Sequence, residues 1–98
     1  MNQREALTKL QSAADSIRAK GAQHLYLFGS TARNEAGPLS DVDLFMDRNP
    51  SVPLGLVGLG AIQSYLEALL GTRVDLTTRN GLHPLIREDV EHNAISVF

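Results

Sequence analysis

LYLFGSTARNEAGPLSDVDLFMD, the stretch from residue 25 to residue 47, contains the pattern on which the fold and the candidate chemistry both depend. One apolar run ends at Gly29-Ser30, and after ten intervening residues Asp41-Val42-Asp43 opens a second apolar run. A glycine lets backbone come close to a phosphate, and carboxylates two positions apart can bind a divalent cation. The stretch therefore indicates a phosphate-binding turn beside a metal-binding carboxylate pair.

Both apolar runs have the composition of strands. Residues 24–28, HLYLF, form a continuous apolar and aromatic run, which is typical of a strand covered on both faces. In residues 41–47, DVDLFMD, the side chains alternate with a period of two. That period places Asp41 and Asp43 on the same face of the strand, with their Cβ atoms about 7 Å apart.

The rest of the chain alternates between helical and strand-like patterns. Apolar residues at helical spacing predict four helices, over Asn2–Lys20, Ser30–Glu35 with Ser30 as N-cap, Leu54–Leu70 and His83–His92. Two further segments have strand character, a third strand over Arg73–Thr77 and one more strand or a docked tail over Ala94–Phe98. This order indicates an α/β (α+β) fold, a small mixed sheet flanked by helices.

Two features of the predicted helices bear on packing. In the last helix, Leu85, Ile86 and Val90 are expected to face inward. In the helix over 54–70, three glycines weaken the first half by up to about 1 kcal/mol each relative to alanine. That half is expected to be loop or to fit against a close neighbour, and it is a candidate partner-binding face.

Length and composition indicate one folded domain. With 98 residues, 43% apolar and 20% charged, the sequence supports a single core over residues 1–98. A formal net charge of −2 argues against a general nucleic-acid binder, which would carry a basic face. The absence of cysteine excludes disulfides and thiolate metal sites, and no apolar run approaches a membrane span. We expect a cytoplasmic protein that binds neither nucleic acid directly nor membranes.

The acidic residues suggest metal-dependent transfer of a phosphorus group. Magnesium is usually held by a few carboxylates together with substrate phosphates, and two ions can clamp the attacking and leaving oxygens. Asp41 and Asp43 can bind such a pair of ions. Asp75, on the polar face of the third strand, is a candidate third ligand and general base if that strand lies beside the second.

The turn supplies candidate groups for the phosphates. Gly29 permits close approach, Ser30 adds a hydroxyl, and Arg33 lies one turn into the predicted helix. Taken singly, each has a plainer explanation, since a Gly-Ser pair is usually a turn and a lone charge is usually solvated. Four residues at fixed spacing, here Gly29, Ser30, Asp41 and Asp43, arise by chance in about one chain in a thousand. The combination indicates a nucleotidyl-transfer site.

The motif resembles the signature of the polymerase-beta-like nucleotidyltransferase superfamily. Gly29-Ser30 and Asp41-Val42-Asp43 carry this resemblance, and Val74-Asp75-Leu76 and the closing His83-Pro84-Leu85-Ile86-Arg87 are similar to the minimal nucleotidyltransferase (MNT) domain proteins. The resemblance covers essentially the whole chain. It implies a nucleotidyltransferase fold with the following catalytic, metal-binding and nucleotide-binding residues: Asp41, Asp43 and Asp75 at the metal, and Gly29, Ser30 and Arg33 at the nucleotide.

The same resemblance implies a biological role. Proteins similar to this one are often antitoxins encoded beside a HEPN-domain ribonuclease toxin, and they transfer AMP from ATP to a tyrosine of that toxin. The chain is then expected to be a protein adenylyltransferase that uses ATP and two Mg²⁺ ions and forms a hetero-oligomer with its partner. Two alternatives stay open: a non-catalytic antitoxin that masks its toxin by binding it, and a nucleotidyltransferase that modifies a small molecule.

Overall fold

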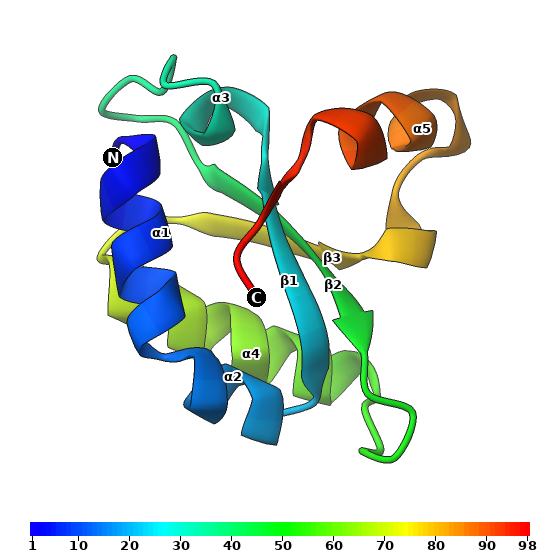
Figure 1. Ribbon diagram of the computed structural model, residues 1–98. Coiled ribbons are helices and arrows are strands. Elements are labelled where there is room, and N and C mark those ends of the chain that lie inside the picture. Colours follow the sequence, from blue (N-terminus) through cyan, green and yellow to red (C-terminus); the bar gives the residue numbers. More distant parts are fainter.

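A four-stranded mixed sheet forms the centre of the structure, a computed structural model that describes residues 1–98 (Figure 1). The strands are β1 Ala22–Phe28, β2 Val42–Arg48, β3 Val74–Thr78 and β4 Ile95–Ser96, in the spatial order β3-β2-β1-β4. β1 is antiparallel to β2 and β4, whereas β2 and β3 are parallel. The helices are α1 Gln3–Ser12, α2 Ala14–Ala19, α3 Gly29–Ala32, α4 Leu56–Leu70 and α5 Pro84–Asn93, with a 3-10 turn, η1, at Arg79–Gly81. The predicted mixed sheet flanked by helices is confirmed.

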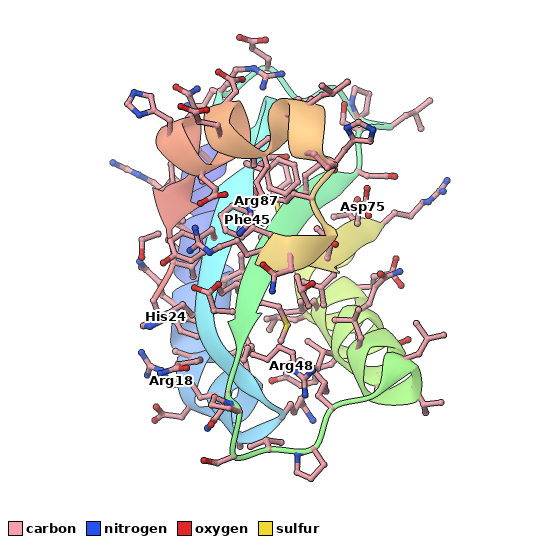
Figure 2. All side chains as sticks on the ribbon, turned by 90° about the vertical axis from the view of Figure 1, so that its right-hand side faces the viewer. Arg18, His24, Phe45, Arg48, Asp75 and Arg87 are labelled. Atoms are coloured by element: carbon pink, nitrogen blue, oxygen red, sulfur yellow. The ribbon has the colours of Figure 1, made fainter.

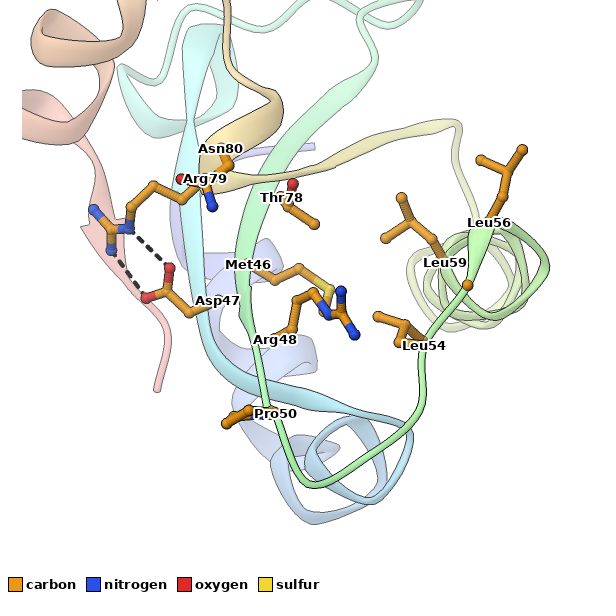
Figure 3. A pocket seen from close by; sticks show the side chains of 11 residues that line it. Met46, Asp47, Arg48, Pro50, Leu54, Leu56, Leu59, Thr78, Arg79 and Asn80 are labelled. Atoms are coloured by element: carbon orange, nitrogen blue, oxygen red, sulfur yellow. Dashed lines mark hydrogen bonds and ion pairs between the residues drawn. The ribbon is translucent and has the colours of Figure 1, made fainter.

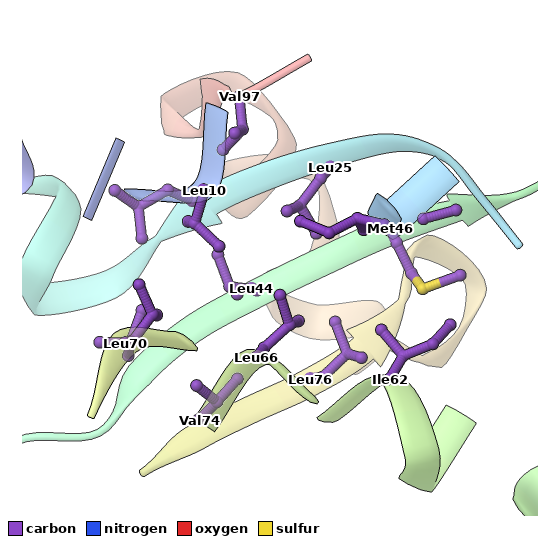
Figure 4. Close-up of a cluster of buried hydrophobic side chains, with 14 of the residues drawn as sticks. Leu10, Leu25, Leu44, Met46, Ile62, Leu66, Leu70, Val74, Leu76 and Val97 are labelled. Atoms are coloured by element: carbon purple, nitrogen blue, oxygen red, sulfur yellow. The ribbon is translucent and has the colours of Figure 1, made fainter. Parts of the chain in front are cut away.

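One face of the sheet and three helices enclose the hydrophobic core. Alternate residues of β2 are buried on this face, namely Val42, Leu44 and Met46. α1, α2 and α4 cover the same face (Figure 1), and α4 contributes Ile62, Leu66 and Leu70 at helical spacing (Figure 4). The strand positions between the buried ones therefore point to the opposite face, where the candidate carboxylates lie.

The N-terminal segment is two helices, which corrects the single helix expected over Asn2–Lys20. The chain leaves helical geometry at Ala13 (φ −106°, ψ 14°), and α2 begins one residue later. α1 packs on α4, whereas α2 packs on β1. Ala6, Leu10 and Ile17 of the predicted apolar stripe are all fully buried. The break allows the two parts of one stripe to pack on different elements.

Most other elements differ from the predictions only at their ends. β1 begins two residues earlier than expected, and β4 forms inside the predicted C-terminal tail. α4 begins at Leu56, and Gly71 ends it in the left-handed conformation (φ 69°) that glycine adopts without strain. No helix combines the length and the apolar character that crossing a membrane requires.

α5 packs differently from the prediction. Leu85 is 88% exposed and Ile86 is 50% exposed, so the expectation that they face inward is wrong. Val90 is half-buried, and α5 contains no fully buried residue. Figure 2 shows α5 crossing the sheet face that lies away from the core. Polar contacts rather than an apolar core hold it there.

A single arginine joins α5 to the sheet. Arg79 Nε and Nη2 donate to Asp47 Oδ1 and Oδ2 at 2.8 and 3.0 Å, and Nη1 donates to Glu91 Oε2 at 2.8 Å. The guanidinium carbon lies 4.9 Å from the ring centroid of Tyr26 and 5.0 Å from that of Phe45. Such a bidentate, ring-stacked arrangement is specific to arginine. These contacts tie β1, β2, η1 and α5 together.

Truncation of Leu66 to alanine should lower the free energy of unfolding by about 2–5 kcal/mol, because this fully buried side chain would leave a cavity. Leu56→Ala on the same helix is the matched control, since Leu56 is 87% exposed and should change stability by no more than about 0.5 kcal/mol. Urea titrations of both variants measure the difference. Equal effects would contradict the described core.

Replacement of Asp47 by asparagine should make stability less dependent on acid pH. The hydrogen bonds from Arg79 lower the pKa of the Asp47 carboxyl. The stability that the ionised carboxylate contributes is therefore fully present above the unfolded-state pKa and is lost as pH falls through the lower folded-state pKa. We expect the free energy of unfolding of the wild type to exceed that of Asp47→Asn by about 1 kcal/mol at pH 7, and we expect this difference to vanish in acid. Urea titrations between pH 7 and pH 2 test this. Asp15→Asn, at a fully exposed carboxylate, is the control, and the same pH profile for both variants would refute the prediction.

Candidate active site

The turn between β1 and α3 requires a glycine for two separate reasons. Gly29 has φ 74°, a conformation that side chains with a Cβ rarely adopt. A Cβ built at this position would also clash with the carboxylate oxygen Oδ2 of Asp43. The backbone of the predicted phosphate-binding turn therefore lies directly against one of the predicted metal ligands.

The register of the sheet aligns the carboxylates. Asp43 lies opposite Phe28 on β1 and opposite Asp75 on β3. Paired positions on neighbouring strands are about 5 Å apart and share a face. The structure thus confirms the expected position of the third strand beside the second, and Figure 2 shows Asp75 on the face that α5 crosses. Asp41 immediately precedes β2, and its Oδ1 lies 3.6 Å from Arg73 Nε in an exposed ion pair.

The pKa of Asp43 reflects this crowding. Burial raises the pKa of the Asp43 carboxyl above its usual range, and the negative charges of Asp75 and then Asp41 raise it further. Arg33 acts in the opposite direction and lowers it. This end of the sheet therefore gathers negative charge that a bound divalent cation would offset.

The chemistry of these donors fits magnesium when a substrate completes the coordination. The three carboxylates do not converge into a group that could hold a metal ion unaided. Magnesium usually keeps several waters and takes one or two carboxylates plus substrate phosphates. Asp43 and Asp75 are in register on adjacent strands and match that requirement. Asp41 lies two residues before Asp43.

A small cleft adjoins the turn. It has a volume of about 370 Å³, and its walls come from α3 and α5, with Gly29, Ala32 and Arg33 on one side and Asp89, Val90 and Asn93 on the other. Arg33 also forms an exposed ion pair with Glu35, at 3.4 Å. Ser30 lies in the first turn of α3 but does not cap it, because the helix begins one residue earlier and has no side-chain cap. The prediction of Ser30 as an N-cap is therefore wrong, and its role at the nucleotide stays a prediction.

Three residues that line this cleft, Asp89, Val90 and Asn93, were not among the site residues predicted from the sequence. A helix over His83–His92 was predicted from its apolar spacing, but its place beside the turn was not, because that place depends on contacts between segments far apart in the chain. Thr31 is 1% exposed, and its hydroxyl has no hydrogen-bond partner. A partnerless buried hydroxyl costs stability. The sequence did signal this position, since Thr31 directly follows the Gly-Ser pair of the motif.

Comparison with known proteins agrees with this geometry. Residues 9–97 match the family model described as the nucleotidyltransferase domain. Protein adenylyltransferase MntA of Thermococcus cleftensis is 38% identical over 77 residues, which cover 79% of this chain and 76% of that protein. A solved structure described as a putative minimal nucleotidyltransferase is 33% identical, with a TM-score of 0.82 and coverage of 97% of this chain and 95% of that chain.

More distant structures share the fold. A toxin–antitoxin structure with AMP-PNP has a TM-score of 0.71 at 19% identity and covers 100% of this chain and 73% of that chain. A tri-AMPylated Shewanella oneidensis HEPN toxin in complex with an MNT antitoxin gives a TM-score of 0.66 at 17% identity, covering 94% and 71%. At such identities the likeness shows the fold alone. Because the family model spans residues 9–97 and a 33% identical structure shares nearly the whole fold, the chain belongs to the nucleotidyltransferase domain family and is one of its minimal members.

Proposed function

We propose that this chain transfers AMP from ATP to a hydroxyl, that of a tyrosine, on a partner HEPN toxin, and that it acts in this way as the toxin's antitoxin. The observation that carries the proposal is the contact of the Gly29 turn with Asp43, which is itself in register with Asp75. A relative at 38% identity is named a protein adenylyltransferase, and distant structures of the same fold contain AMP-PNP or an AMPylated HEPN toxin. The proposed role is that of a cytoplasmic protein that forms a hetero-oligomer with the toxin.

Each candidate residue has a separate role in the proposed reaction. The acceptor oxygen forms a bond to the α-phosphorus of ATP, the bond from that phosphorus to the bridging oxygen breaks, and pyrophosphate leaves. Asp75 is exposed and takes the proton of the acceptor hydroxyl. Asp41 and Asp43 are the other two carboxylates of the site. Magnesium, two ions in the full form of the proposal, would be held by these three carboxylates and would supply positive charge against the triphosphate.

The turn and its cleft have a positioning role. Phosphoryl and nucleotidyl transfer depend mainly on placement and on electrostatic stabilisation, since the protein contributes little covalent chemistry. Gly29 presents backbone without a side chain, Ser30 adds a hydroxyl, and Arg33 supplies a cation at the cleft. The nucleotide phosphates are therefore assigned to the space between α3 and the carboxylates.

The double variant Asp41→Ala/Asp43→Ala should reduce AMP transfer by about 100-fold or more, because the charges that position the reacting groups are gone. The measurement is transfer of label from α-labelled ATP, with Mg²⁺, to the protein encoded beside this chain, which the proposal takes to be the HEPN toxin. Asp15→Ala, a fully exposed carboxylate on α2, should transfer at the wild-type rate. An unlabelled partner with the wild type, or equal labelling by the double variant, would refute the catalytic assignment.

The same double variant separates catalysis from masking. The exposed apolar side chains of Leu39, Leu56, Val57 and Leu85 are compatible with a protein that neutralises its partner by covering it. If neutralisation depends on AMP transfer, the double variant binds the toxin but no longer protects against it. Full protection by the double variant would support the masking alternative.

Gly29→Ala should abolish most of the transfer activity, because the new Cβ displaces the Asp43 carboxylate. Gly71→Ala is the matched control: Gly71 has φ 69°, close to the 74° of Gly29, but nothing lies within 4 Å of a Cβ there. Both variants should lose about 1–2 kcal/mol of stability from left-handed strain. Label transfer and urea titration of both variants measure the two effects. Comparable activity of the two variants would show that the Gly29–Asp43 contact is unimportant.

A further inference from the structure

A second cleft, larger than the one beside the turn, lies away from the candidate active site. It has a volume of about 790 Å³ and lies between the C-terminal ends of β2 and β3 and the first turn of α4 (Figure 3). Arg48, at its centre, is five residues beyond Asp43 on β2, which is about 16 Å along the strand. An odd separation also places the two side chains on opposite faces of the sheet. Arg48 lies low in Figure 2, whereas Asp75 lies higher, near α5.

The cleft has an apolar border that nothing in the chain covers. Leu54, Leu56 and Leu59 line it, and Leu56 and Val57 are 87% and 89% exposed. Two adjacent aliphatic residues at this exposure, beside a cleft, are typical of a surface that another protein covers. The cleft therefore continues into an exposed apolar surface on the first turn of α4.

Gly55 is the N-cap of α4, a position that favours glycine, and a Cβ at Gly58 would meet Leu54, whereas Gly60 has no such explanation inside the molecule. Gly55 lines the cleft and Gly60 lies in α4, and nothing lies within 4 Å of a Cβ built at either position. Neither has a positive φ, so backbone conformation does not require glycine there. Glycine inside a helix weakens it relative to alanine. The effect of Gly60 is to leave the helix surface bare, so that a second backbone can approach closely.

The cleft also holds one charge without a counter-ion. Arg48 forms no ion pair, and Figure 3 shows its guanidinium directed into the cleft near Leu54. The other charges at the border, Asp47 and Arg79, neutralise each other through two hydrogen bonds. Burying an unpaired cation under an apolar partner is costly unless the partner supplies a carboxylate. The occupant must therefore combine apolar side chains with an acidic one.

A second copy of this chain does not meet that requirement. In a symmetric contact the same patch would face itself, and Arg48 would approach Arg48 of the second copy. The patch has no unpaired carboxylate to offer in return, because Asp47 is bonded to Arg79 and residues 49–60, NPSVPLGLVGLG, contain no acidic residue. The sequence of the patch thus favours a different protein as the occupant.

We propose that this surface, formed by Arg48, Leu54, Leu56, Val57, Leu59 and Gly60, docks an apolar segment of the acceptor protein that carries a carboxylate for Arg48. The proposal rests on the proposed function in taking the acceptor as that partner. Docking here leaves the carboxylate face of the sheet uncovered, so one surface retains the acceptor while the other modifies it.

Calorimetric titration with the protein encoded beside this chain, taken under the proposed function as the HEPN-domain acceptor, tests the docking in the absence of ATP. Leu56→Asp and Arg48→Glu should each weaken binding at least about 10-fold, because one places a charge against the apolar segment and the other repels the carboxylate. Both should raise the KM for the acceptor and leave kcat unchanged. Arg4→Glu, an exposed charge reversal on α1, should bind like the wild type, and unchanged urea midpoints should show that all variants fold.

Each outcome decides the docking proposal. Wild-type affinity and KM for both variants overturn it while the proposed function stands. A wild type that binds but transfers no AMP refutes the proposed function, and the affinities alone then judge the docking. A wild-type homodimer that Leu56→Asp dissociates, without any effect on the HEPN protein, assigns the surface to a second copy and overturns the proposal.

Discussion

The close approach of Gly29 to Asp43 is the constraint on which the rest of the site depends. The backbone turn can touch the carboxylate only because residue 29 has no Cβ and because Phe28 and Asp43 are paired across β1 and β2. The parallel pairing of β2 and β3 then adds Asp75 in register with Asp43. Two strand pairings and one glycine are sufficient to place the predicted phosphate-binding turn beside the carboxylates. The core on the opposite face, which holds the strands in this register, therefore also holds the site.

The two faces of the sheet are stabilised by different interactions. Aliphatic side chains from α1, α2 and α4 cover one face, whereas the other face depends on Arg79, which bonds to Asp47 and Glu91 and stacks on Tyr26 and Phe45. The contacts of Arg79 hold α5 in position, and α5 forms one wall of the cleft beside the turn. The polar face therefore stays accessible to ligands while its cover is held in a defined position.

Local patterns in the sequence predicted the sheet and the placement of the carboxylates. The alternation in residues 41–47 predicted the faces of β2, because it depends on neighbouring residues. The proximity of Gly29 to Asp43 depends on the pairing of β1 with β2, and it was predicted from the spacing of the motif. The break at Ala13 and the orientation of α5 were not predictable in the same way. Arg79 and Asp47 are 32 positions apart, and no periodicity encodes such a contact. The exposed Leu85 shows the consequence, since an amphipathic pattern does not reveal whether a core lies beneath it.

Intact-mass and peptide-fragment mass spectrometry of the partner HEPN protein tests the central claim most directly. The protein is incubated with this chain, ATP and Mg²⁺, and the acceptor residue is then mapped. The account predicts that the partner gains AMP on a tyrosine and that an Asp43→Asn variant of this chain, which keeps the shape of the side chain, adds almost none. A partner of unchanged mass in a complex that has demonstrably formed, or equal addition by Asp43→Asn, would contradict it.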